Sequence, residues 1–388
     1  MKRVVFFLFS LFFFCFSVYA EEFDITGEYV SLYNMNEDML IYSKNDTKKT
    51  SIASLTKMMT TLVAIENIDD LEKVITIKER DFDGTVGYSK AGFSVGDKVT
   101  YLDLLYGIIL PSGADAVNAI VNNTLGYNSF IKKMNETAKK IGMNDTSFAN
   151  PIGKDDENNY STSSDIAKLL KYALKNETFK KVFTTKSYKT SNGINLESTV
   201  NSYKSILNTS EILGAKSGFT KNAGRCLASI TTLNGVDYLL VVINSSTSSP
   251  SNAVKDTITI YDYYSSNYGY KNILNDDTFI KEIPVDLSKE KTYKITGNED
   301  VNKYLKNGDE VTYEYVGSDK ITFNTKKGSK LGVVNIYNGD ELIATSNVYL
   351  ENNIEYYPIV TYVLIFIGVI FILLIIRKSK KNHRRRRR

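Results

Sequence analysis

The chain has 388 residues, 43% of them hydrophobic, and a formal net charge of +4. Its length exceeds that of an average domain, so we expect two folded units. Eleven of the 48 basic residues lie in the first three and last twelve positions. The rest of the chain contains 37 basic and 44 acidic residues, which gives it a net charge of −7. This acidic body argues against a nucleic-acid-binding function, which places a basic face on the folded domain itself.

The first twenty residues have the pattern of a signal peptide. Lys2 and Arg3 precede an apolar run over residues 4–16, and Ala20 is the small residue that a cleavage site requires. The run is too short to span a membrane comfortably. Removal of residues 1–20 leaves Cys226 as the single cysteine, so we expect no internal disulfide and interpret Cys226 as a buried structural thiol.

A second long apolar segment lies near the other end of the chain. Residues 359–376 carry no charge, and at about 1.5 Å per residue they span roughly 27 Å, close to the hydrocarbon thickness of a bilayer. We predict one transmembrane helix over residues 357–376 and a basic tail over residues 377–388, which the positive-inside rule keeps cytoplasmic. The expected location is the cell membrane, with a single span and an extracytoplasmic body.

Strand and helix signals alternate in the first part of the chain. A hairpin is predicted over residues 29–42, and a second one, around Asn234-Gly235, joins strands 225–233 and 236–244. A glycine-rich loop over or beside a site is expected at 81–100. Helices are predicted over residues 55–65, 101–110, 114–121, 130–141, 165–174 and 253–264. This order predicts an α/β (α+β) fold, an antiparallel sheet whose halves come from distant parts of the chain, with a helical region inserted between them.

The pattern changes to short β-prone runs near residue 272. These runs are separated by polar turns and cover residues 279–285, 292–295, 310–315, 321–324, 331–337 and 341–348. They predict a small all-β domain over residues 272–355. It has no cluster of carboxylates, histidines or cysteines, so we interpret it as a spacer or an interaction module.

A short stretch, Ala53-Ser54-Leu55-Thr56-Lys57, offers a nucleophile. Residues i and i+3 of a helix share one face, so Lys57 can act as a base for the Ser54 hydroxyl if burial lowers the pKa of its amine. The spacing alone is not selective, because it recurs at Ser129/Lys132 and Ser288/Lys291. The single histidine, His383, lies in the basic tail, which excludes histidine-dependent triads and metal sites from the body.

Three motifs occur in the order Ser54-x-x-Lys57, Ser112-Gly113 and Lys216-Ser217-Gly218. They resemble the motifs of penicillin-binding proteins and serine β-lactamases. The flanking residues, such as Gly214-Ala215 and Phe219-Thr220 around the third motif, are similar to those of low-molecular-mass D-alanyl-D-alanine carboxypeptidases. The resemblance covers about residues 25–268, and the β domain with a C-terminal anchor fits the same layout. It implies a β-lactamase/transpeptidase-like carboxypeptidase domain over residues 21–271.

The resemblance implies a serine-type carboxypeptidase that removes the terminal D-Ala from peptidoglycan stem pentapeptides, and that β-lactam antibiotics inhibit covalently. No metal or cofactor is expected. In this family pattern Ser54 attacks the carbonyl of the penultimate D-Ala, Lys57 takes its proton, and Ser112 relays a proton to the leaving D-Ala.

Substrate binding is implied for the third motif and the residue after it. Lys216 and Ser217 would bind the terminal carboxylate of the substrate, and Gly218 and Phe219 continue the substrate-binding strand. The backbone N–H groups of Ser54 and Phe219 would form the oxyanion hole.

The second motif departs from the family pattern. The usual Ser-x-Asn is replaced by Ser112-Gly113-Ala114, with Asp115 next. Either Asp115 or a water takes over from the missing amide, or activity is reduced. Two alternatives stay open: a β-lactamase, for which we identify no additional carboxylate for fast deacylation, and a catalytically weak, membrane-tethered protein that binds the cell wall.

Overall fold

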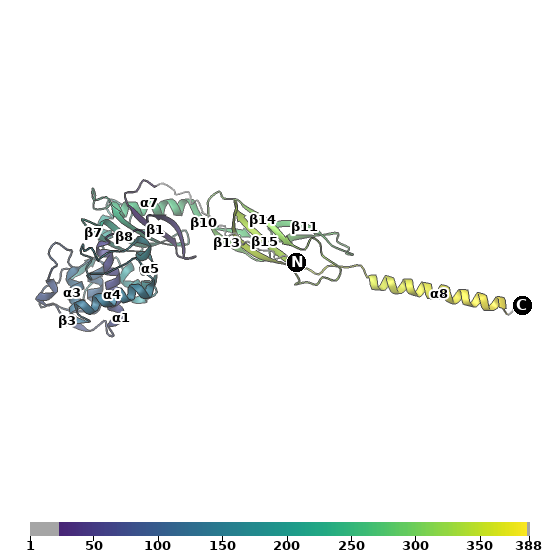
Figure 1. Ribbon diagram of the computed structural model, residues 1–388, viewed down its shortest axis with the longest axis horizontal. Coiled ribbons are helices and arrows are strands. Elements are labelled where there is room, and N and C mark those ends of the chain that lie inside the picture. Colours follow the sequence, from purple (N-terminus) through teal and green to yellow (C-terminus); the bar gives the residue numbers. More distant parts are fainter. Residues whose placement is uncertain (1–22, 386–388) are drawn as a thin grey trace, which may run out of the picture. The chain divides into compact units, whose positions relative to one another are not determined.

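The computed structural model describes residues 23–385 and contains two compact units (Figure 1). The boundary between the units falls after Ser266, whereas the sequence patterns placed it after residue 271. The predicted signal peptide over residues 1–20 lies outside the described residues, as do the last three residues of the basic tail.

The first unit is built on a five-stranded antiparallel sheet with the strand order β2-β1-β9-β8-β7. Its strands are β1 (Tyr29–Asn34), β2 (Met39–Lys44), β7 (Gly214–Thr220), β8 (Gly224–Leu233) and β9 (Val236–Ser245). Val30 pairs with Val242, so the predicted sheet with halves from distant parts of the chain is confirmed. The predicted turn is also confirmed: Asn234 and Gly235 have φ angles of 51° and 79°, a conformation these two residues tolerate best.

Helices cover both faces of this sheet. Helix α7 (Asn252–Asn267) lies on one face and α5 (Ser163–Ala173) on the other (Figure 1). The remaining helices are α1 (Thr56–Asn67), α2 (Tyr101–Ile109), α3 (Ala114–Asn123), α4 (Tyr127–Ile141) and α6 (Glu177–Thr184), with 3₁₀ turns η1 (Ala53–Leu55), η2 (Glu79–Phe82) and η3 (Thr199–Tyr203). Two short hairpins pair β3 (Val74–Thr76) with β4 (Lys98–Thr100) and β5 (Ser187–Lys189) with β6 (Asn195–Glu197).

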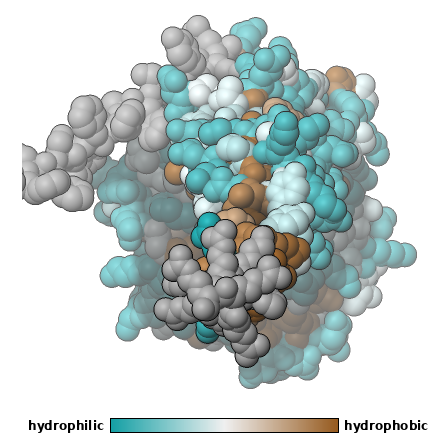
Figure 2. Space-filling model, turned by 90° about the vertical axis from the view of Figure 1, so that its right-hand side faces the viewer, coloured by the Kyte–Doolittle hydropathy of each residue, from teal (hydrophilic) through white to brown (hydrophobic). Residues whose placement is uncertain are grey.

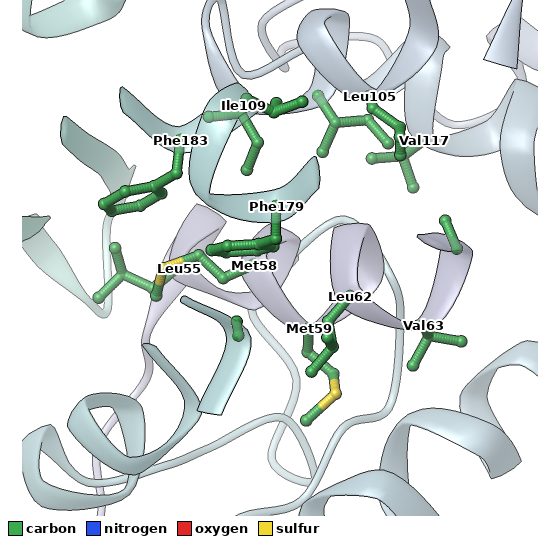
Figure 3. Close-up of a cluster of buried hydrophobic side chains, with 14 of the residues drawn as sticks. Leu55, Met58, Met59, Leu62, Val63, Leu105, Ile109, Val117, Phe179 and Phe183 are labelled. Atoms are coloured by element: carbon green, nitrogen blue, oxygen red, sulfur yellow. The ribbon is translucent and has the colours of Figure 1, made fainter. Parts of the chain in front are cut away.

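Helix α1 lies at the centre of the first unit. All its residues from Thr56 to Ala64 are buried, because other helices surround it. Figure 3 shows the side chains that pack there, which come from α1 and its 3₁₀ turn (Leu55, Met58, Met59, Leu62, Val63), from α2 and α3 (Leu105, Ile109, Val117) and from α6 (Phe179, Phe183). This close packing holds the start of α1 in one position.

Helix α6 was missed by the sequence patterns. Asn176 caps it by accepting a hydrogen bond from the Phe179 N–H at 3.0 Å, and Phe179, Val182 and Phe183 are buried. The helix is only eight residues long and rich in threonine and aromatic residues, so its propensity is weak, and tertiary packing stabilises it. The β5–β6 hairpin and η3 were missed for the same reason.

The second unit is all-β in the part that precedes its final helix, as predicted. Its strands are β10 (Tyr268–Leu274), β11 (Phe279–Pro284), β12 (Thr292–Thr296), β13 (Val301–Lys306), β14 (Val311–Gly317), β15 (Lys330–Asn338) and β16 (Glu341–Tyr349). Strands β10 and β13 were not predicted. The predicted strand over 321–324 is wrong: Ile321 forms an isolated bridge with Val285, and a turn follows.

Helix α8 (Ile359–Arg385) ends the described chain. Its segment Thr361–Ser379 has a mean hydropathy of 2.3 and is long and apolar enough to cross a membrane, and none of it is buried. Figure 2 shows hydrophobic residues near the centre of the face that it draws, among mostly hydrophilic residues. The apolar length agrees with the predicted membrane anchor.

Candidate active site

Ser54 lies in the 3₁₀ turn η1, directly before helix α1. Its neighbour Ala53 has a φ of 46°, a left-handed conformation that costs an alanine free energy. Two glycines allow the surrounding chain to approach. A Cβ at Gly153 would lie 2.0 Å from the Ala53 carbonyl oxygen, and one at Gly218 would lie 3.0 Å from the Ser54 nitrogen. The strained turn is therefore held between the Gly153 loop and strand β7.

Lys57 is one turn further along, on the same face as Ser54. Its Nζ lies 2.9 Å from the Ser54 Oγ, and its side chain is 1% exposed. Burial lowers the pKa of the Lys57 amine to about 7, although the charge of Asp115 acts in the opposite direction and raises it. A lowered pKa favours the neutral amine, and a neutral amine can accept the serine proton.

The other two Ser-x-x-Lys pairs differ from this one. Lys132 is exposed on the surface of α4 and its nearest charged partner is Glu136, at 3.9 Å. Ser288 accepts a hydrogen bond from the Glu290 N–H instead. Of the three Ser-x-x-Lys pairs, all within the described residues, Ser54 and Lys57 are the pair that forms a serine–lysine hydrogen bond.

Ser112 lies between α2 and α3 and is contacted by a second buried lysine. The Lys216 Nζ donates to the Ser112 Oγ at 2.9 Å and to the Ser217 carbonyl at 2.7 Å. Lys216 is fully buried, and burial together with the nearby Lys57 holds the pKa of its amine well below the usual value. Ser112 has a φ of 65°, another left-handed non-glycine residue. Two lysine–serine pairs thus adjoin each other in the interior.

A cleft of about 250 Å³ opens beside these groups. The structure brings Ser54, Ser112, Ser217, Gly218 and Phe219 together in its lining. Strand β7, which carries the last three of these residues, is an edge strand of the sheet, so its backbone can pair with an extended peptide. Part of the glycine-rich loop, Gly87–Ser89, also lines the cleft, which confirms the expectation that this loop lies beside a site.

Several lining residues were missed in the sequence. Thr199 lies in η3, and its hydroxyl is 2.6 Å from the Ser217 Oγ. Arg225, on β8, and Tyr203 also line the cleft. Arg225 belongs to the segment Ala223-Gly224-Arg225-Cys226, which follows the third motif and also resembles the carboxypeptidase family. Thr199 has no sequence signal, because the fold alone places η3 against β7.

The departure at the second motif is visible in the structure. Ala114 is fully buried at the start of α3. Asp115 accepts a hydrogen bond from the Ala91 N–H at 2.8 Å through Oδ1, while its buried Oδ2 has no hydrogen-bond partner in the described residues. Asp115 therefore acts on Lys57 through its charge and not through a direct hydrogen bond.

Cys226 is buried, as predicted, and burial raises the pKa of its thiol to about 12. No group of three or more His, Cys, Asp or Glu side chains in the described part of the chain is placed to hold a metal ion.

The fold, and a cleft that adjoins a hydrogen-bonded serine–lysine pair, fit a serine hydrolase. The family model for D-alanyl-D-alanine carboxypeptidases matches residues 17–247, and the model for the C-terminal domain of penicillin-binding protein 5 matches residues 268–356. The first match covers more than half of the sequence, so the chain belongs to the D-alanyl-D-alanine carboxypeptidase family of serine peptidases.

Individual relatives agree with this assignment. The chain is 28% identical over 330 residues to D-alanyl-D-alanine carboxypeptidase DacF of Bacillus subtilis (strain 168), covering 83% of this chain and 84% of that protein. It is 33% identical over 227 residues to the D-alanyl-D-alanine carboxypeptidase of Streptomyces sp. (strain K15), covering 54% and 78%. The structure of penicillin binding protein 5 from Haemophilus influenzae has the same fold, with a TM-score of 0.63 at 22% identity, covering 86% of this chain and 99% of that one. These similarities favour the carboxypeptidase over the β-lactamase and the wall-binding protein.

Proposed function

We propose that this protein removes the terminal D-Ala from peptidoglycan stem pentapeptides through an acyl-enzyme on Ser54. The observation that supports this most is the 2.9 Å contact between the Lys57 Nζ and the Ser54 Oγ, in an interior that lowers the pKa of the amine to about 7. A buried amine with this pKa is a suitable general base at neutral pH.

The reaction proceeds in two steps. The neutral Lys57 amine takes the Ser54 proton as the oxygen attacks the penultimate D-Ala carbonyl, and the oxyanion is held by the backbone N–H groups of Ser54 and Phe219. Ser112, which accepts a hydrogen bond from Lys216, relays the proton from the Lys57 ammonium to the leaving amine of the terminal D-Ala. Water then hydrolyses the ester and restores Ser54.

The substrate lies along the free edge of β7. Its backbone pairs with the strand, close to Gly218, and its terminal carboxylate lies near Ser217. β-Lactam antibiotics carry a carboxylate and a strained amide in a similar arrangement, so they acylate Ser54 and block it.

The protein is anchored in the cell membrane through α8. The segment Thr361–Ser379 spans the bilayer, and the basic residues after it stay on the cytoplasmic side by the positive-inside rule. The signal peptide predicted over residues 1–20 directs the body across the membrane. Both features support a position of the cleft on the side of the membrane where peptidoglycan lies.

Release of D-Ala from a pentapeptide ending in D-Ala-D-Ala is the direct test, with intact mass after penicillin exposure as a second measurement. We expect D-Ala release and a stable adduct with the wild type, and neither with Ser54→Ala. Rapid turnover of penicillin with no D-Ala release would instead establish a β-lactamase. The absence of both adduct and turnover would establish the wall-binding alternative.

A further inference from the structure

Arg225 lies on β8, directly opposite Phe219 of β7 in the sheet register. Its guanidinium carbon is 4.0 Å from the centroid of the Phe219 ring, so the ring fixes the direction of the side chain. Residues two apart on a strand share one face, which puts Ser217, Phe219 and Arg225 on the same face of the sheet. Ser217 is a diagonal neighbour of Arg225, within reach of a long side chain, and both line the cleft.

No protein group neutralises Arg225 in the described residues. Its buried Nε has no hydrogen-bond partner, and none of the ion pairs within residues 23–385 includes it. The residues that line the cleft include no aspartate or glutamate. Asp155, on a neighbouring loop, is bonded to Thr220 and Asn222. A partly buried guanidinium without a counter-charge is costly, and an anionic ligand would remove that cost.

Lys216 is poorly placed to supply the whole charge for such an anion. Its amine is fully buried, and its hydrogen bonds to Ser112 and to the Ser217 carbonyl leave at most one N–H free. Burial and the nearby Lys57 also lower the pKa of this amine, which favours its neutral form. An arginine stays charged at every working pH and offers two parallel N–H donors to a carboxylate.

We infer that Arg225 binds the terminal carboxylate of the substrate, together with the hydroxyl groups of Ser217 and Thr199, while Lys216 chiefly positions Ser112. The 2.6 Å contact between the two hydroxyls places them side by side on the same face as Arg225. The inference rests on the proposed carboxypeptidase function, and it assigns recognition of the substrate's terminal carboxylate to Arg225.

The test compares two substrates and two variants of the full chain. The substrates are an acylated peptide ending in D-Ala-D-Ala and the same peptide with a C-terminal amide in place of the carboxylate. We expect the wild type to favour the acid about 100-fold in kcat/KM, the size of effect that a charged, desolvated hydrogen-bonded pair produces. Arg225→Gln should lower kcat/KM for the acid by about the same factor and leave the amide nearly unchanged. Arg225→Lys keeps the charge and loses the bidentate geometry. Its kcat/KM for the acid should lie between those of the wild type and Arg225→Gln.

The ratio of kcat/KM for the acid to kcat/KM for the amide separates loss of carboxylate binding from damage to the fold. A structural role for Arg225 would lower both rates together, whereas loss of the carboxylate contact lowers only the rate on the acid. Equal losses on acid and amide, or an unchanged preference for the acid in either variant, would overturn the inference and leave the proposed function intact. If Arg225→Gln does not fold, Arg225→Lys carries the test by the same ratio. A wild type that releases no D-Ala from the acid would instead contradict the proposed function itself.

Discussion

The two units differ in what they bury. Within the described residues the first unit buries two lysines and five aspartates, whereas the buried polar side chains of the second unit are Ser288 and Ser346. Among residues 23–385, the two buried side-chain polar atoms without a hydrogen-bond partner, Asp115 Oδ2 and Arg225 Nε, also belong to the first unit. Buried charge is costly, so a fold keeps it where something other than stability requires it.

Most of the buried aspartates have a structural explanation. Asp103 closes the capping box at the start of α2, and Asp256 accepts hydrogen bonds from Thr26, Gly27 and Ser245. Near Ser54, Asp115 also accepts a backbone hydrogen bond from Ala91, but its Oδ2 has no partner among the described residues, and the amines of Lys57 and Lys216 are buried beside each other. The comparison indicates that the second unit is a simple packed β structure, whereas the first unit buries charged groups around Ser54 at a cost in stability, as expected for the proposed active site.

Replacement of Lys57 should have the largest effect on activity. Lys57→Met keeps the volume and removes the amine, so we expect kcat/KM for D-Ala release to fall about 10³-fold or more, as for loss of a general base. The rate of penicillin acylation should fall similarly. The matched control is Lys132→Met, in the exposed pair with identical spacing. If both variants kept wild-type rates, Lys57 would not be the base.

Gly153→Ala should damage both stability and activity. The new Cβ would lie 2.0 Å from the Ala53 carbonyl oxygen, at a φ of 87°, and we expect a loss of about 3 kcal/mol in the free energy of unfolding. Gly142→Ala is the matched control, because Gly142 has a φ of 85° with nothing within 4 Å. It should cost about 1 kcal/mol, measured by urea unfolding, and leave acylation unchanged. If the two variants lost the same free energy of unfolding, the contact between Gly153 and the Ala53 carbonyl would not explain the effect.

Much of this arrangement follows from the sequence, and some of it does not. The order of the Ser54, Ser112 and Lys216 motifs selected one Ser-x-x-Lys pair out of three, because that order resembles a known family. The Asn234-Gly235 turn located the central hairpin, because a turn signal is local. Thr199 and helix α6 were missed, since their positions depend on packing between segments far apart in the chain. The unpartnered Nε of Arg225 is likewise visible only in three dimensions, because a sequence does not show which charges lack a partner.

Asp115→Asn should have a smaller effect, seen in the pH profile. The carboxylate raises the pKa of Lys57, so its removal should lower that pKa and move the rise of acylation to lower pH. The asparagine carbonyl can still accept from the Ala91 N–H, so the fold should be retained. A profile that moves to higher pH, or does not move, would show that Asp115 does not act through its charge.

The smallest effect on activity should come from the second unit. Ile336 is fully buried in the core of that unit, and Ile336→Ala should lower its stability by about 3 kcal/mol through loss of packing. Penicillin acylation at 25 °C should stay within a factor of two of the wild-type rate. A large loss of acylation in a variant that is still folded would show that the second unit contributes to the activity of the first.

The most direct test of the account is the pH dependence of Ser54 acylation by penicillin in the wild-type protein. The folded-state pKa of Lys57 is lowered to about 7, and the reactive form is the deprotonated amine. The acylation rate should therefore be low at acidic pH, rise tenfold per pH unit below the pKa, pass its midpoint near pH 7 and level off above it. A midpoint near the ordinary lysine value of 10.5, or a rate independent of pH between 5 and 9, would contradict the assignment of Lys57 as a buried general base.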